Sequence, residues 1–289
     1  MTHADHLRDI LVRRIEETGF RAHGLHVRVG DETAAYRWTP DEREEIHSVA
    51  KAVSVLAAGI AVDEGLVSLD EPIADIEAAG DRDFTLRNLL TMTSGVDFPW
   101  SPTLMTDWPD LAVEFLSRPS RGRVFQYSNA SSYTAMHALS RRVGDIEEYL
   151  RPRLFAPLGL DDVAWARCPN GRVLGGEGLA LRTDEMARLG QLIRDRGVWR
   201  GRRLVSAGIV DAMHSGWVDT GGQGDGYRRY ALSGWDGPGA AWRLHGAYGQ
   251  LVIFVEDTVV TVSADDHEGA DAFAAFVAVT AAGAGCPPL

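Results

Sequence analysis

The sequence predicts an α/β fold of the α+β type, in which both ends of the chain build one sheet layer and the middle is mainly helical. Two observations lead to this prediction. Strand patterns lie near both ends of the 289-residue chain, and helical patterns fill most of the segment between them. Because a sheet must bury a face against another layer, we expect residues 1–65 and 225–289 to form an α/β subdomain. Residues 66–224 would form a mainly helical subdomain beside it.

The first 65 residues contain patterns for two helices and two strands. Residues 4–18 carry apolar side chains at helical spacing. GLHVRVG (24–30) and ETAAYRW (32–38) are typical of two strands joined by a tight Gly-Asp connection. After a polar loop, apolar residues on one face predict a helix over 48–64, which we expect Gly65 to end.

The rest of the chain first continues the helical pattern and then returns to strands. Helical segments are predicted at 84–92, 109–117, 131–143, 145–150, 183–196 and 206–214. A glycine-rich stretch at 215–226 predicts a mobile loop. Strands follow at 227–235, 240–245, 250–256 and 258–264, and a helix over 268–282 comes last.

Composition and charge exclude several classes of partner. The net charge of −12 and the pI near 5.2 argue against a nucleic-acid partner, which would require a basic face. The longest apolar run, 52–62, is too short to span a membrane. The N-terminus carries early charges and has no apolar core of a secretory signal. We therefore expect a cytoplasmic protein, and the oligomeric state is not predicted by these patterns.

Lys51 is the only lysine in the chain, beside 28 arginines, and it follows Ser48 by three residues. In one interpretation this spacing is chance, with Ser48 a plain N-cap and Lys51 an exposed side chain. In the other it is chemical. Arginine stays protonated, whereas a desolvated lysine can lose its proton and act as a base for a serine nucleophile. Residues three apart share a helix face, so the geometry allows the chemical interpretation.

Two further stretches favour the chemical interpretation. FQYSNASSY (125–133) contains Tyr127 and Asn129. A phenol beside a lysine can exchange protons with it, and an amide can orient the lysine or a substrate. RLHGAYG (243–249) predicts a strand that ends in small residues, where backbone N–H groups could face a substrate oxyanion.

With these motifs the sequence resembles the serine β-lactamase and penicillin-binding-protein superfamily. The branch is similar to the class C β-lactamase-like hydrolases, which include family VIII carboxylesterases, D-aminopeptidases and nylon-oligomer hydrolases. Ser48-Val-Ala-Lys51 matches Ser-x-x-Lys, and Tyr127-Ser-Asn129 matches Tyr-x-Asn. His245-Gly246-Ala247 stands where the family has Lys-Thr-Gly or a variant. The resemblance runs from about residue 24 to residue 264, with the motifs in the family's order.

The resemblance implies an antiparallel sheet flanked by helices plus an all-helical subdomain, with one active site at their interface. It implies that Ser48 is acylated by a carbonyl substrate and that Lys51 and Tyr127 share the general-base and general-acid work. Asn129 would hold the substrate or the lysine. The backbone N–H groups of Ser48 and of a residue near Tyr248 would form the oxyanion hole. No cofactor and no metal is implied.

The third motif departs from the β-lactamase pattern. His245 replaces a lysine that helps to bind a carboxylate, and Gly246 has no hydroxyl to assist it. A neutral imidazole is a poor anchor for a carboxylate. We therefore expect an esterase or amidase acting on a small-molecule ester, amide or lactam, with weak or no β-lactamase activity. The alternatives are a β-lactamase or D-amino-acid peptidase, an acyltransferase, and a non-catalytic ligand-binding homologue.

Overall fold

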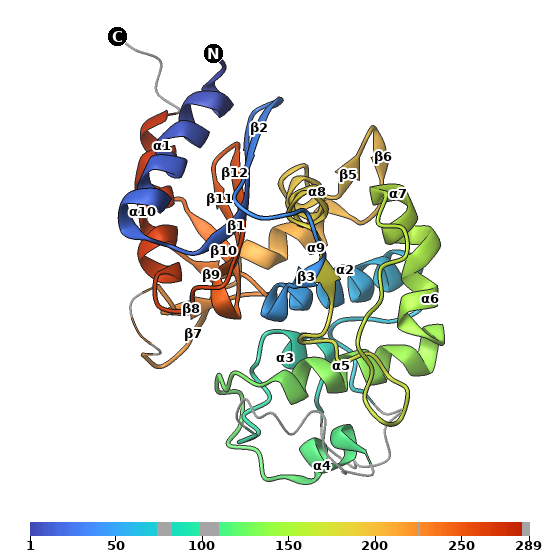
Figure 1. The fold of residues 1–289 in the computed structure, drawn as a ribbon. Helices are drawn as coiled ribbons and strands as arrows, with labels where there is room; N and C mark the ends of the chain where they lie inside the picture. The colour runs from blue at the N-terminus through green and yellow to red at the C-terminus, as the bar shows by residue number, and fades with distance from the viewer. Residues whose placement is uncertain (74–82, 99–109, 223, 225, 285–289) are drawn as a thin grey trace.

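An eight-stranded antiparallel sheet forms a layer between helices in the computed structural model, which describes residues 1–73, 83–98, 110–222, 224 and 226–284 (Figure 1). The strand order is β2-β1-β12-β11-β10-β9-β8-β7. The strands are β1 (Ala22–Val29), β2 (Glu32–Arg37), β7 (Val218–Asp219), β8 (Arg229–Tyr230), β9 (Trp235–Asp236), β10 (Trp242–Gly246), β11 (Gln250–Val255) and β12 (Thr258–Ala264). Since β1 pairs directly with β12, the two ends of the chain build one sheet, which confirms the predicted fold class.

Helices cover both faces of the sheet (Figure 1). On one face, α1 (His3–Thr18) and α10 (Ala270–Ala284) pack side by side on the strands. On the other face lies α8 (Thr183–Arg194), whose Gly190 lets the helix approach β11 closely, because a Cβ there would lie 2.8 Å from Val252. Behind α8, the same apolar core includes α2 (Ala50–Asp63).

The helix α2 is buried on every side, although the sequence pattern indicated a single apolar face. Every residue from Ala50 to Ala61 is buried. Small side chains make this possible; a Cβ on Gly59 would lie only 2.5 Å from Ile209 of the neighbouring helix α9 (Ala207–Asp211). The remaining helices of the helical part are α3 (Leu86–Leu90), α4 (Leu111–Ser117), α5 (Asn129–Val143), α6 (Ile146–Leu150) and α7 (Ala156–Leu158). As predicted, Gly65 follows the end of α2 with a left-handed φ of 69°.

Several predicted boundaries are wrong for identifiable reasons. The strand predicted over 227–235 is two strands, β8 and β9, because the chain turns between them with Ser233 at a φ of 67°. The predicted polar loop before Ile46 contains a short strand, β3 (Glu44–Glu45), which pairs with β4 (Ala180–Leu181). The hairpin of β5 (Val198–Trp199) and β6 (Arg202–Arg203) was not predicted.

Two other differences concern helices and the described range. A π-helical turn over Arg151–Phe155 continues α6 into α7, where no helix was predicted. Residue 109 of the helix predicted over 109–117 lies outside the described residues, as do residues 223 and 225 of the predicted glycine-rich loop. The division into subdomains at residues 65 and 225 stays a prediction. Two elements from within residues 66–224 belong to the sheet layer, β7 by its hydrogen bonds and α8 by its packing.

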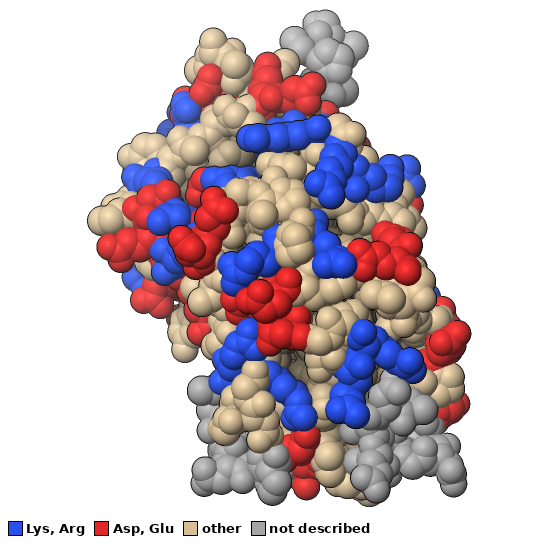
Figure 2. All heavy atoms as spheres, turned by 90° about the vertical axis from the view of Figure 1, so that its right-hand side faces the viewer, with Lys and Arg blue, Asp and Glu red and all other residues tan. Residues whose placement is uncertain are grey.

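The described surface is highly charged but mixed in sign. Figure 2 shows basic and acidic side chains intermingled on the face it presents. Many arginines are in ion pairs, such as Arg87 with Asp70 and Arg153 with Glu64. Within the described ranges, no helix combines the length and the apolar character that crossing a bilayer requires.

The loops that contain Gly95 and Gly122 approach each other closely and hold the segment that leads to Tyr127. The backbone N–H of Arg121 donates to the Gly95 carbonyl at 2.9 Å, and that of Gln126 donates to the Met92 carbonyl at 2.8 Å. Gly95 has a φ of 63°, and a Cβ on it would overlap the Gly122 carbonyl oxygen. Only glycine therefore fits at this position.

Gly95→Ala is expected to lower the free energy of unfolding by about 3 kcal/mol or more, because it adds a backbone clash to the strain of a positive φ. Gly122→Ala is the matched control. Its φ is also positive, at 90°, but a Cβ there meets nothing within 4 Å, so a loss of only about 1–2 kcal/mol is expected. Urea unfolding of both variants tests the difference. Equal losses of unfolding free energy in the two variants would show that the clash with the Gly122 carbonyl does not destabilise the protein.

Candidate active site

The start of α2 brings Ser48 and Lys51 into direct contact. Ser48 lies in a 3₁₀ turn (His47–Val49) that leads into the helix, and Lys51 lies in the helix's first turn. The Lys51 Nζ is 2.8 Å from the Ser48 Oγ, and Lys51 is only 2% exposed. The interpretation of Lys51 as an exposed surface side chain is therefore wrong.

Two further acceptors complete the surroundings of the Lys51 amine. The Nζ donates to the Asn129 Oδ1 at 2.5 Å and to the Gly176 carbonyl at 2.9 Å. A neutral amine has two N–H groups and one lone pair. If the two N–H groups take the amide and carbonyl oxygens, the lone pair faces the Ser48 hydroxyl. This arrangement suits removal of the serine proton by Lys51.

The segment 175–177 supplies contacts that the sequence analysis missed. Gly176 places its carbonyl on Lys51, and a Cβ at this position would lie 3.0 Å from the Asn129 Oδ1. Glu177 accepts a hydrogen bond of 2.8 Å from the Asn129 Nδ2, which fixes the amide with its oxygen towards the lysine. The only signal in the sequence was the run GGEG, which by itself indicates a turn.

Tyr127 lies beside the same amine. The Lys51 Nζ is 4.8 Å from the centroid of the Tyr127 ring. Aromatic neighbours hold that ring in place, with centroids 6.0 Å away for Tyr230 and 5.6 Å away for Trp235. The structure thus brings together Ser48, Lys51, Tyr127 and Asn129, which are far apart in the sequence apart from the pairs 48/51 and 127/129. The catalytic roles that the resemblance implies for them stay predictions.

A cavity of about 750 Å³ opens in front of Ser48. Its described lining comprises Glu45, His47, Ser48, Ala166, Leu174, Glu177, Gly178, Ala247, Tyr248 and His267. Pockets of this size hold small organic ligands. The predicted oxyanion residues Ala247 and Tyr248 therefore share a cavity with the predicted nucleophile.

Two residues that line the cavity beside Ser48 have an unusual backbone conformation. His47 and Tyr248 have positive φ values of 46° and 59°, and their rings are 5.1 Å apart. Left-handed non-glycine residues are strained and concentrate at functional sites. Gly246 lets β10 pack directly on the turn that carries the serine, since a Cβ there would overlap the Ile46 carbonyl. This close approach explains a glycine where the family motif has threonine.

The His245 side chain lies outside this cavity, contrary to the expectation that it contacts substrate. In the sheet His245 pairs with Leu251, which belongs to the core under α1 and α10. Directly opposed residues share a face, so His245 points to the α10 side. Its Nδ1 is 3.1 Å from the Arg243 Nε and 3.0 Å from the Tyr227 hydroxyl. Because Arg243 can only donate, we assign the His245 proton to Nε2.

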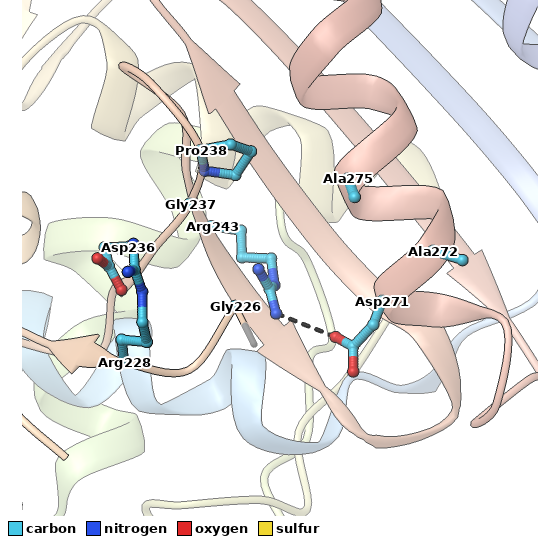
Figure 3. Close-up of a pocket in the computed structure, with 9 residues that line it drawn as sticks. All are labelled: Gly226, Arg228, Asp236, Gly237, Pro238, Arg243, Asp271, Ala272 and Ala275. Atoms are coloured by element: carbon cyan, nitrogen blue, oxygen red, sulfur yellow. Dashed lines mark hydrogen bonds and ion pairs between the residues drawn. The ribbon is translucent and has the colours of Figure 1, made fainter. Parts of the chain in front are cut away.

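Arg243 and Tyr227 both reach Asp271 on α10. The Arg243 Nη2 and the Tyr227 hydroxyl donate to the Asp271 Oδ1 at 3.0 and 2.6 Å. Figure 3 shows Arg243 extending from β10 towards Asp271, beside a separate cavity of about 450 Å³. Burial, followed by the charge of Arg243, lowers the pKa of His245 to about 3. His245 is thus a neutral member of a polar network.

This network gives the stability of the protein a predictable dependence on pH. The folded-state pKa of His245 is depressed below the ordinary value of 6.5, so below that value the unfolded chain binds a proton that the folded chain does not. Stability is therefore lost as the pH falls from 6.5 towards 3. Between pH 5.5 and 4 the wild type should lose about 1.4 kcal/mol per pH unit more than His245→Gln. Urea unfolding at several pH values measures both slopes, and parallel slopes would contradict this assignment.

Nearly the whole chain matches a known family. The family model described as Beta-lactamase matches residues 7–283. The chain is also 29% identical over 237 residues to the 6-aminohexanoate-dimer hydrolase of Paenarthrobacter ureafaciens. That match covers 71% of this chain and 60% of the relative, so the chain spans less than two thirds of the relative's length.

Solved structures show the same fold at low identity. A class C beta lactamase from Rhodobacter sphaeroides superposes with a TM-score of 0.75 at 19% identity, covering 97% of this chain and 99% of the other. A D-amino acid amidase from Ochrobactrum anthropi SV3 gives a TM-score of 0.74 at 15% identity, covering 97% of both chains. At such identities the likeness concerns the fold alone.

Proposed function

Because this chain belongs to the Beta-lactamase family, we propose that it is a serine esterase or amidase that forms an acyl-enzyme on Ser48. The observation that carries the proposal is the 2.8 Å contact between the Lys51 Nζ and the Ser48 Oγ. A serine hydroxyl is a weak nucleophile, and a base within hydrogen-bond distance is what activates it.

The proposed reaction has two halves. In the first, the Ser48 Oγ bonds to the carbonyl carbon of the substrate while its proton passes to Lys51. The bond to the leaving alcohol or amine breaks, and the leaving group takes a proton through Tyr127. In the second half a water molecule attacks the acyl-enzyme, and the carboxylic acid leaves with Ser48 regenerated. Asn129 and Gly176 hold the lysine throughout.

The site favours small esters and amides over β-lactams. A β-lactam carries a carboxylate that calls for a cationic anchor, and the described cavity lining contains no lysine or arginine. The neutral His245 occupies the motif position of that anchor, and its Nδ1 accepts a hydrogen bond from the Arg243 Nε, which holds the ring away from the cavity. The names of the relatives, a 6-aminohexanoate-dimer hydrolase and a D-amino acid amidase, support including amides among the substrates.

The test is covalent labelling of Ser48 by a generic fluorophosphonate probe, read by intact mass. The Ser48 Oγ forms a bond to phosphorus and fluoride leaves, so one adduct is expected on the wild type. Neither Ser48→Ala nor Lys51→Arg should be labelled, since one lacks the nucleophile and the other the base. A folded wild type without an adduct would overturn the proposal and favour a non-catalytic binding protein.

Product analysis separates hydrolysis from acyl transfer. Both reactions use the same acyl-enzyme and differ in whether water or another acceptor attacks it. Turnover of an ester in the presence of added alcohols and amines should yield mainly the free acid. Predominant formation of the new ester or amide would identify an acyltransferase instead.

A further inference from the structure

The charge of the cavity carries an inference about the substrate that rests on the proposed function. We propose that the cavity selects ester and amide substrates with a cationic group, such as an ammonium, on either side of the bond that is cleaved, and discriminates against anionic ones through the carboxylates of Glu45 and Glu177. Both residues line the cavity that contains Ser48. They come from different segments of the chain: Glu45 is in β3, and Glu177 lies just before β4, the strand with which β3 pairs.

Glu177 is tied to the reacting groups by a short chain of contacts. Its Oε2 accepts from the Asn129 Nδ2 at 2.8 Å, and the Asn129 Oδ1 accepts from Lys51. Its negative charge is therefore fixed in position, and only Asn129 and Lys51 stand between it and the nucleophile Ser48 in this chain of contacts. A charge held by hydrogen bonds in a partly buried site acts on a ligand more strongly than a mobile surface charge.

Glu45 is fixed in a similar way. Its Oε1 accepts a hydrogen bond of 2.8 Å from the backbone N–H of Gly178, and its side chain remains 44% exposed. Glu45 ends β3, three residues before Ser48 in the chain. This carboxylate thus lies on the rim of the cavity, where it can contact a bound molecule and still face solvent.

In the described lining, these two carboxylates are the only acidic or basic side chains besides two histidines. That lining contains no lysine or arginine, and Lys51 stands behind Ser48 with its amine held by protein acceptors. Burial lowers the pKa of His47 and so favours its neutral form; Glu45, 3.6 Å from the His47 Nδ1, opposes this effect and Lys51 adds to it. Among the described residues, the charges that face a substrate are therefore mainly these two carboxylates, in a protein of net charge −12.

The test compares esters that differ only in charge. Three p-nitrophenyl esters share a three-methylene acyl chain that ends in trimethylammonium, in its neutral isostere tert-butyl, or in sulfonate. A second set of acetate esters carries the same head groups on the alcohol. Rates are divided by each ester's rate with hydroxide, which removes intrinsic reactivity. In at least one set, kcat/KM should favour the cation over the neutral ester about tenfold, with the anion slowest.

Matched variants assign the preference to the two carboxylates. Glu45→Gln and Glu177→Gln remove a charge but keep an oxygen that can accept from Gly178 and Asn129. Each should lower the cation-to-neutral ratio about threefold. Glu16→Gln is the control, since it removes an exposed carboxylate from α1, on the opposite face of the sheet. This variant should leave the ratio unchanged.

The possible failures can be told apart. A wild type that reacts with no fluorophosphonate and hydrolyses no ester contradicts the proposed function itself. A protein that is labelled but shows a cation-to-neutral ratio of one or less in both sets, or hydrolyses none of the esters, overturns the charge selection alone. A cation preference that both glutamine variants retain overturns the assignment to Glu45 and Glu177.

Discussion

Replacing Lys51 by arginine is expected to lower kcat/KM for any hydrolysed ester or amide by about 10³-fold or more. A guanidinium stays protonated at every usable pH and cannot accept the Ser48 proton. The Lys51 Nζ already contacts Ser48, Asn129 and Gly176 at 2.5–2.9 Å, so the larger guanidinium cannot take the same position. The variant would therefore carry a permanent positive charge and lack the base.

Because Lys51 is buried, a loss of folding must be distinguished from a loss of chemistry. Lys51→Met keeps the length of the side chain and removes both the charge and the base. If this variant keeps the wild-type unfolding transition and is also inactive, the lost activity is chemical. A Lys51→Arg or Lys51→Met protein that retains a tenth of the wild-type kcat/KM would exclude Lys51 as the base.

The second large effect is expected for Tyr127→Phe, which should lower kcat about 10²-fold with little change in stability. The substitution keeps the ring that packs against Tyr230 and Trp235 and removes only the hydroxyl that we propose to protonate the leaving group. The deficit should shrink for esters with better leaving groups, because these need less proton donation. Steady-state kinetics on a series of aryl esters measures it.

Tyr133→Phe provides the matched control for this change. Tyr133 is buried in α5, and its hydroxyl lies 3.2 Å from the Cys168 sulfur. Its loss should cost about 1 kcal/mol of stability and leave kcat unchanged. If Tyr127→Phe instead behaved like this control, with lower stability and full activity, Tyr127 would be a packing residue.

The contact between Ser48 and Lys51 was predictable because it is local. Residues three apart on a helix meet whatever the rest of the fold does. The clustering of Tyr127 and Asn129 around them is non-local, and it was expected only because the motifs resemble those of a family. The contact of Glu177 with Asn129 had no comparable signal, since it depends on how the 175–177 turn closes over the lysine.

The direction of the His245 side chain could not be predicted from the sequence for a different reason. Its position in the third motif was identified from the sequence, but its direction follows from strand alternation. Trp242 and Leu244 face the core that contains α2, so Arg243 and His245 face α10. The alternation was visible in AAWRLH, but it shows where His245 points only when the elements that pack on each face of the strand are known. Similarly, the burial of α2 on all sides depends on neighbours that periodicity does not show.

The pairing of β1 with β12 has a consequence for how the protein is made. On the ribosome, residues 22–29 emerge more than two hundred residues before their partner residues 258–264. Until then, β1 and β2 form only a hairpin with an unpaired edge, a marginal structure that is prone to wrong association. The sheet is therefore completed only late in synthesis. Only then can β10 pack against the turn that carries Ser48. We therefore expect slow folding dominated by long-range pairing, and a need for protection of the nascent N-terminal hairpin.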